Sequence, residues 1–144
     1  MNMMSQIPEY IVRNFGHNLS FKKFELCSKD GHKAVESLLN NTVLAGGKRL
    51  RPILTFLFSG LFGVSKEDSK VIAESIEFVH AASLAHDDVI DFAETRRSRP
   101  SINVLAGNKK AILAGDYLLS EVIQRLCVLN KPALLDEMAG TIKS

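Results

Sequence analysis

Apolar residues recur along most of the chain at the three- and four-residue spacing that is typical of helices. This spacing predicts helices over residues 5–26, 31–44, 52–62, 65–93, 109–128 and 133–142. Gly46 and Gly47 end the second of these, since glycine accepts the left-handed conformation on which many helices stop. Pro52 suits the first turn of the next helix, and Ser65, with Asp68 three residues later, resembles a capping arrangement. No segment alternates as a strand would, so the pattern predicts a single all-α domain over residues 1–144.

The segment 65–93 is the longest of these helices, and it is apolar on most sides. A helix of that kind usually lies at the centre of a bundle. Four polar residues nonetheless share one narrow stripe on it: His80, Ser83, Asp87 and Asp91. Buried polar groups without partners are costly, so this stripe is expected to line a cavity.

Composition and charge are those of an ordinary globular protein. The 144 residues, 46% apolar and 24% charged, are enough for one domain with a modest core. The net charge of +2 is too close to balance to indicate nucleic acid as a partner. Cys27 and Cys127 fit no metal or redox spacing, so reduced thiols in a cytoplasmic protein are expected. The N-terminus has no signal-peptide pattern and the apolar run 53–62 is too short to span a bilayer, so no stable membrane insertion is expected.

The strongest candidate for chemistry is the end of the long helix, where three carboxylates stand in a DDxxD spacing. Asp87 and Asp91 lie four residues apart and would point the same way, separated by a rise of about 6 Å. Oxygens so arranged, with Asp88 beside them, suit hard divalent cations and Mg²⁺ above all. Arg96 and Arg97 follow closely, and guanidinium groups match phosphate oxygens bidentately. The segment therefore predicts a site for a metal-bound phosphate or diphosphate ester.

Plainer explanations exist for each part of this site. A surface helix end could carry DDxxD, yet acids at the C-terminal end of a helix oppose its dipole and need compensation, which a metal would supply. A lone His80 would more often belong to a core, but its place on the polar stripe favours contact with a ligand. His86 lies about 100° off that stripe and is expected to be structural.

Basic residues gather in three clusters at predicted helix ends or loops: Lys48, Arg49 and Arg51; Arg96, Arg97 and Arg99; Lys109 and Lys110. Solvated surface charge is the usual fate of such residues, and a weak nucleic-acid patch is a second explanation. Two of the clusters, however, adjoin features that fix position, namely the Gly-Gly turn and the acidic helix end. Residues 95–107 form a basic loop in this interpretation, and Asn108 could cap the helix that follows. The surplus of basic residues predicts a second bound anion.

Taken in order, these motifs resemble the trans-isoprenyl diphosphate synthase family. The matching residues are Gly46-Gly47-Lys48-Arg49-Leu50-Arg51-Pro52, His80, Asp87-Asp88-Val89-Ile90-Asp91, Arg96-Arg97, Gly107-Asn108 and Gly115-Asp116-Tyr117-Leu118-Leu119. The resemblance runs from about residue 31 to 128. It implies an all-α bundle, usually a homodimer, that joins isopentenyl diphosphate to an allylic diphosphate and so elongates an isoprenoid chain.

The resemblance also implies roles for single residues. Asp87 and Asp91 resemble the Mg²⁺ ligands that hold the allylic diphosphate, with Asp88 in support, and Arg96 resembles the arginine that contacts the same diphosphate. The pocket for isopentenyl diphosphate is implied by a second set: Lys48, Arg51, His80 and Arg97. Breaking the allylic C–O bond leaves a cation and a diphosphate anion, and metal and arginine stabilise the departing charge.

Product length follows from the residues just before the aspartates, where family enzymes often place a bulky stopper. Ala82, Ser83 and Ala85 are all small, so the resemblance implies a medium- or long-chain product. We expect Ala82→Phe to shorten the products.

One departure from the family is large. Its members carry a second aspartate-rich motif in their C-terminal half, and Asp136-Glu137 lacks both the spacing and the context for it. The chain is therefore expected to form an incomplete bundle, with little or no synthase activity by itself. Uncovered apolar faces would favour a homodimer, a higher oligomer or association with another chain.

Other functions are also compatible with these residues. His86-Asp87 forms the HD pair of a metal-dependent phosphohydrolase, which would need further His and Asp ligands from separate helices. A non-catalytic partner or regulatory subunit could use the same scaffold for binding. A class I terpene cyclase shares the aspartates but needs no second diphosphate pocket, so Lys48, Arg51 and His80 disfavour it.

Overall fold

The computed structural model describes residue 26 and residues 31–143, and it confirms the predicted all-α class. The helices are α2 (Lys33–Asn41), α3 (Leu50–Leu61), α4 (Lys66–Ile90), α5 (Ile102–Ala106), α6 (Asn108–Val128) and α7 (Pro132–Lys143). A short antiparallel hairpin joins α4 to α5, with β1 (Thr95–Arg96) paired to β2 (Arg99–Pro100). The helix predicted over residues 5–26 lies outside the described residues, apart from Leu26.

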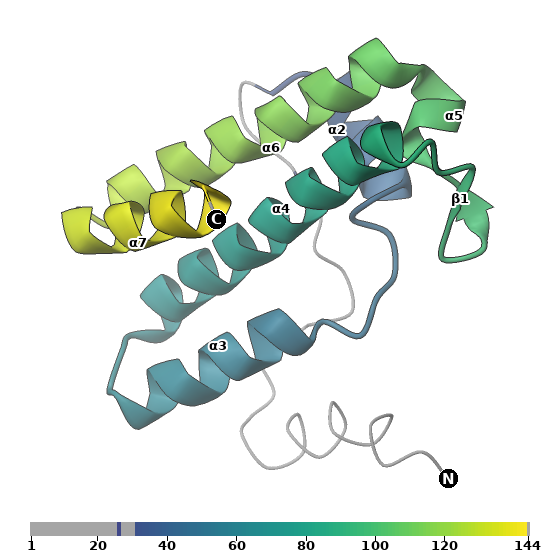
Figure 1. Ribbon diagram of the computed structural model, residues 1–144. Coiled ribbons are helices and arrows are strands. Elements are labelled where there is room, and N and C mark those ends of the chain that lie inside the picture. Colours follow the sequence, from purple (N-terminus) through teal and green to yellow (C-terminus); the bar gives the residue numbers. More distant parts are fainter. Residues whose placement is uncertain (1–25, 27–30, 144) are drawn as a thin grey trace, which may run out of the picture.

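Helix α4 runs through the middle of the described chain, with α3 on one side and α6 on the other (Figure 1). Its most extensive packing is against α6. Both helices present small buried residues: Ala81, Ala82 and Ala85 from α4, and Ala111, Ala114 and Gly115 from α6. Small side chains allow two helices to approach closely, because the distance between helix axes depends on the side chains at the contact. The helix thus occupies the central place that its apolar surface predicts.

Side-chain and backbone bonds set the two ends of α4. Ser65 is its N-cap, and the Ser65 hydroxyl oxygen accepts the Asp68 N–H at 3.0 Å, as the sequence predicts. The helix ends at Ile90 rather than near residue 93, because Phe92 takes the left-handed conformation at φ +51° and turns the chain away. This turn presents the end of the helix, with its aspartates, to the hairpin that follows.

The segment 95–107, predicted as a loop, is instead largely ordered secondary structure. Arg97 and Ser98 form the tip of the hairpin with φ of +51° and +62°, the pair of left-handed residues that a tight two-residue β-turn requires. Ser101 then ties the hairpin back to the end of α4, since its hydroxyl donates to the Ala93 carbonyl at 2.6 Å. The sequence pattern missed both the hairpin and α5 because neither is long enough to show a period.

Two other predicted boundaries are corrected by a few residues. Asn108 is the first residue of α6 rather than its cap, and the N-cap is Gly107 at φ +83°, which offers no side-chain bond. Helix α2 ends at Asn41 rather than at residue 44. Val43 and Leu44 are each only 2% exposed, so the apolar stripe that suggested a longer helix continues in a turn that packs into the core.

No helix in the portion that the structure describes is both long and apolar enough to cross a membrane.

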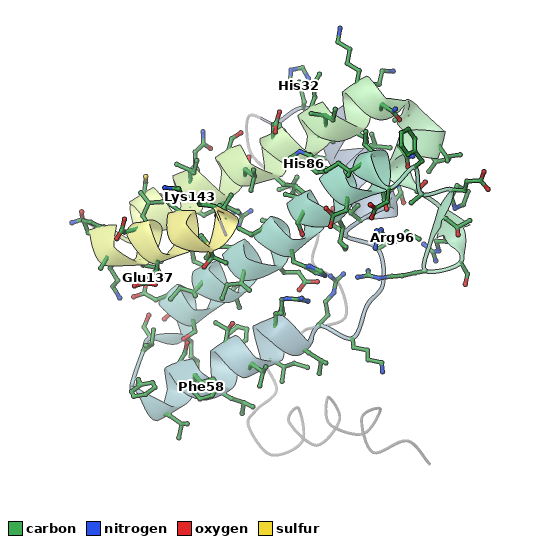
Figure 2. The ribbon with its side chains drawn as sticks, in the orientation of Figure 1. His32, Phe58, His86, Arg96, Glu137 and Lys143 are labelled. Atoms are coloured by element: carbon green, nitrogen blue, oxygen red, sulfur yellow. The ribbon has the colours of Figure 1, made fainter. Side chains whose placement is uncertain are left out.

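Part of the apolar surface of α3 is exposed. The outer face of this helix exposes Leu54, Phe58 and Leu61 by 51%, 57% and 78%, and Phe58 is labelled in Figure 2. Residues at this spacing share one helix face. An exposed apolar stripe of this kind is typical of a surface that packs against another protein element.

Candidate functional site

Two carboxylates project from the C-terminal end of α4. Asp87 lies in the last turn and Asp91 follows as the C-cap, with the Asp91 N–H donating to the Asp87 carbonyl at 2.8 Å. Both residues are exposed, and neither side chain is hydrogen-bonded or ion-paired to another residue that the structure describes. Negative charge at this end of a helix opposes the helix dipole. The pair is therefore open to a cation from solvent.

These two residues fit a magnesium ion that is shared with a phosphate ligand. Mg²⁺ is bound through one or two carboxylates together with water and substrate phosphates, rather than by a cage of protein ligands alone. Asp87 and Asp91 supply two exposed carboxylates one helical turn apart. Among the described residues, no group of three or more His, Cys, Asp or Glu side chains is arranged to hold a metal.

Asp88 faces in a different direction from its neighbours. Its side chain is fully buried, and its Oδ1 accepts the Arg96 Nε–H at 2.8 Å and lies 2.6 Å from Arg96 Nη2. Figure 2 shows Arg96 at the hairpin, beside the end of α4. The other carboxylate oxygen, Oδ2, is buried without a hydrogen-bond partner in the described residues. The predicted role of Asp88 as a metal ligand stays a prediction, and its burial favours a different one, the holding of Arg96.

A second group of residues surrounds a cavity of about 100 Å³ between the Gly-Gly turn, α4 and the hairpin. Its lining is mostly basic: Gly47, Lys48, Arg49, Leu50, Arg51, Glu77, His80 and Arg97. All four residues that the sequence analysis assigns to one pocket, Lys48, Arg51, His80 and Arg97, are therefore brought together. His80 and Asp87 lie on the same helix, separated by a rise of about 10 Å. The cavity and the exposed carboxylates thus form neighbouring sites.

The turn that carries Lys48 depends on glycine. Gly46 and Gly47 have φ of +69° and +93°, a conformation that other residues rarely adopt. A Cβ atom on Gly47 would lie only 3.1 Å from the guanidinium of Arg97. That guanidinium donates from Nη1 to the Ala45 carbonyl at 2.7 Å. The Gly-Gly pair therefore allows both the turn and the close approach of the hairpin arginine to it.

Two residues of this cavity, Arg49 and Glu77, form a pair that the sequence pattern does not reveal. The sequence pattern places Arg49 only in a basic cluster and assigns no role to Glu77, yet the Arg49 guanidinium contacts the Glu77 carboxylate and also the Leu44 carbonyl. The signal that could have found Glu77 is its place one turn before His80 on α4. An acidic residue there lies beside the basic turn rather than in solvent.

Positive charge is concentrated around the cavity. Burial lowers the pKa of His80 below its ordinary value, and the charge of Arg51 lowers it further, against an opposing effect of Glu77. Burial and the charge of Arg49 likewise lower the pKa of the Arg97 guanidinium. His80 is therefore neutral at neutral pH. A cavity with this balance favours an anion.

His86 packs against α6, as the sequence analysis expects of a structural residue. Its Nε2 lies 3.1 Å from the Ile112 carbonyl oxygen and 3.4 Å from the Asp116 carboxylate (Figure 2). A Cβ on Gly115 would lie only 2.3 Å from the same nitrogen, so the glycine makes room for the ring. His86 thus contacts α6, which does not favour the hypothesis that His86 and Asp87 form the HD pair of a phosphohydrolase.

Two of the three small residues before the aspartates, Ala82 and Ser83, face different surroundings. Ala82 is 1% exposed and belongs to the core cluster shared with α6, whereas Ser83 is exposed on the stripe of Asp87. A phenylalanine at residue 82 would overpack the core. Of these two residues, Ser83 is the one open to solvent.

A family model for polyprenyl synthetases matches residues 32–144. The chain belongs to the polyprenyl synthetase family. The chain is 41% identical over 98 residues to heptaprenyl diphosphate synthase component 2 of Geobacillus stearothermophilus, which covers 68% of this chain and 31% of the relative. It is 40% identical over 142 residues to the decaprenyl-diphosphate synthase of Dictyostelium discoideum, covering 98% of this chain and 31% of that protein. The chain thus spans about a third of the length of these curated relatives.

Solved structures of the same family share this arrangement of helices. A decaprenyl diphosphate synthase from Rhodobacter capsulatus superposes with a TM-score of 0.81 at 28% identity, over 97% of this chain and 43% of that one. A polyprenyl synthase from Caulobacter crescentus, complexed with calcium and isoprenyl diphosphate, gives a TM-score of 0.75 at 26% identity, over 97% of this chain and 39% of that one. The relatives are prenyl diphosphate synthases, which establishes the general reaction class of the family.

Proposed function

We propose that this chain supplies the diphosphate sites of a prenyltransferase that condenses isopentenyl diphosphate with an allylic diphosphate. The product would be a trans-polyprenyl diphosphate of medium or long chain. The observation that carries the proposal is the basic cavity about 10 Å along α4 from two exposed carboxylates. Two anions of the same kind can then be held side by side, one through a metal and one through basic side chains.

The allylic diphosphate is assigned to the end of α4. Asp87 and Asp91 would hold Mg²⁺, which supplies charge stabilisation for the departing diphosphate when bound. Arg96 would contact the same diphosphate, and Asp88 would fix the direction of Arg96 through the bonds to its Oδ1. A guanidinium so oriented needs little reorganisation when charge develops on the leaving oxygen.

Isopentenyl diphosphate is assigned to the basic cavity. Lys48, Arg51 and Arg97 would neutralise its diphosphate, and the neutral His80 would add a hydrogen bond. The directions of the two hairpin arginines support this division, because Arg96 contacts the end of α4 while Arg97 contacts the Gly-Gly turn. Neighbouring arginines would thereby serve different substrates and hold them at a fixed separation.

The reaction then requires no acidic or basic side chain at the reacting carbon. Heterolysis of the allylic C–O bond leaves an allylic cation, and the double bond of isopentenyl diphosphate attacks it. The proton lost from the new cation goes to the released diphosphate. Apolar walls would protect the cation from water.

A chimera tests the proposal directly. Residues 1–144 would replace the matching part of the Dictyostelium decaprenyl-diphosphate synthase, which is 40% identical over 98% of this chain. With labelled isopentenyl diphosphate, an allylic diphosphate and Mg²⁺, we expect chain elongation, and Arg51→Gln should raise KM for isopentenyl diphosphate more than for the allylic substrate. A folded chimera that forms no carbon–carbon bond would contradict the proposal. Residues 1–144 alone are expected to give little or no product.

A second candidate is a subunit that acts with a separate chain. Relatives from Geobacillus stearothermophilus and Bacillus subtilis are each named as component 2 of heptaprenyl diphosphate synthase, which supports this alternative. A non-catalytic or regulatory role would appear as a changed product length when residues 1–144 are added to a full-length synthase. We also propose a cytoplasmic protein, in line with the free thiol of Cys127, and a homodimer or larger assembly, which light scattering would measure.

A further inference from the structure

A buried ion pair lies beneath the basic cavity. The side chains of Arg49 and Glu77 are each only 6% exposed, and the guanidinium of Arg49 contacts the carboxylate of Glu77 through Nη1. Arg49 belongs to the turn before α3, whereas Glu77 belongs to α4. The pair therefore joins two elements that both supply basic residues to the cavity.

Arg49 is also bound to the chain on the other side of the turn. Its Nη2 contacts the Leu44 carbonyl, so one planar guanidinium bridges residue 44 and helix α4. Its backbone is left-handed at φ +53°, a conformation that is unusual outside glycine and asparagine. Such a conformation persists only where the surroundings hold it. The two side-chain contacts of Arg49 and its position as the N-cap of α3 stabilise its left-handed backbone conformation.

The negative charge of Glu77 does not help the cavity to bind an anion. It is the only acidic residue among the eight that line the cavity, and a carboxylate beside a diphosphate site repels the ligand. Its charge is instead matched by Arg49, whose own burial would be costly without a partner. The pair thus adds nearly no net charge to the cavity and acts through position.

We propose that Arg49 and Glu77 are positioning residues that hold the Gly-Gly turn in the shape that binds diphosphate. The inference rests on the proposed function for the identity of the anion. Through this pair, Lys48 on the turn and Arg51 at the start of α3 keep a fixed distance from His80 on α4, since Glu77 lies one turn from His80. The bridge prepares the cavity before any ligand arrives.

Binding of inorganic diphosphate to residues 1–144, measured by calorimetry in EDTA, tests this inference. EDTA removes divalent metal and so prevents metal-dependent binding at Asp87 and Asp91, which leaves the basic cavity as the site that can bind diphosphate. Glu77→Gln removes a negative charge, so a purely electrostatic role predicts tighter binding, whereas a positioning role predicts binding weaker by about tenfold. Arg49→Lys should keep the charge but lose the bridge, and should also weaken binding. The control is Glu74→Gln. Glu74 lies on α4, as Glu77 does, but outside the cavity lining, and it contacts Arg125 of α6 at 2.7 Å, so this variant should leave diphosphate affinity unchanged.

The outcomes separate this inference from the proposed function. If the unaltered chain binds no diphosphate in EDTA, the basic cavity is not the proposed second site and the proposed function fails. If the chain binds and Glu77→Gln binds equally well or more tightly, only the positioning role is refuted. Circular dichroism checks that each variant is folded. If Glu77→Gln does not fold, the double variant Arg49→Met with Glu77→Met replaces the buried ion pair with two apolar side chains and leaves no unpaired charge. Wild-type affinity for diphosphate in that double variant would overturn the inference.

Discussion

Asp87→Asn and Asp88→Asn make the same chemical change at neighbouring positions, and the structure predicts opposite results. Asp87 is exposed, whereas the carboxylate of Asp88 is fully buried against Arg96. The first substitution removes a charge that faces solvent at the end of a helix. The second removes the charge that fixes a guanidinium.

The expected magnitudes follow from burial. Breaking a buried ion pair by removing one partner costs about 3–5 kcal/mol. The Arg96 side chain is 29% exposed and can turn toward water, so we expect Asp88→Asn to lower the free energy of unfolding by only about 2 kcal/mol. That loss would lower Tm by roughly 8 °C for a chain of this size. Asp87→Asn should change stability by less than about 0.5 kcal/mol and in the stabilising direction, because the lost charge opposes the helix dipole.

Urea denaturation followed by circular dichroism at 222 nm measures both changes in stability. Calorimetry with Mg²⁺ and inorganic diphosphate tests the proposed metal site. We expect Asp87→Asn to lose metal-dependent binding and Asp88→Asn, once shown to be folded, to keep it with reduced affinity. Equal stability of the two variants would refute the anchoring of Arg96. Equal loss of the Mg²⁺ dependence would instead restore Asp88 to the role of metal ligand.

Other side chains give expectations that can be measured on the purified chain. The pKa of His80 is lowered on folding, so the stability that neutral His80 contributes should be present above pH 6.5, the pKa of an unfolded histidine, and lost as the pH falls below that value. A His80 ring that titrates above pH 6.5 in NMR would contradict this. Gly115→Ala should destabilise by about 1–3 kcal/mol, since overpacking against His86 outweighs a gain in helix propensity of about 1 kcal/mol, whereas Gly60→Ala, with open space around it, should be neutral or stabilising. In the chimera, Ser83→Phe should shorten the products, and an unchanged product spectrum would count against Ser83 as the residue that meets the growing chain.

The sequence predicted the parts of the fold and site that follow a helical period. The capping of α4 by Ser65 and the structural place of His86 both depend on local spacing, and the structure agrees with each. The gathering of Lys48 and Arg51 with His80 came from the family resemblance rather than from periodicity. A turn and a helix that are distant in sequence can be brought together only by tertiary packing, which a single sequence does not display.

The parts that could not be predicted depend on left-handed residues and on long-range bonds. The hairpin tip at Arg97 and Ser98, and the turn at Arg49, use positive φ values in residues that rarely adopt them. The side chains of these residues do not predict a left-handed conformation. It is imposed by contacts such as that of Arg97 with the Ala45 carbonyl, more than fifty residues away in the chain.

Three consecutive residues of α4 illustrate why a motif must be interpreted around the helix as well as along it. His86 contacts α6, Asp87 faces solvent, and Asp88 is buried against the hairpin arginine. Successive positions are about 100° apart, so one turn of helix can contribute to the core, to the proposed metal site and to the support of a neighbouring residue. The two adjacent aspartates therefore cannot serve the same ligand equally. The residue that shares the solvent-facing direction of Asp87 is Asp91, and the pair that could hold a metal is the pair four residues apart.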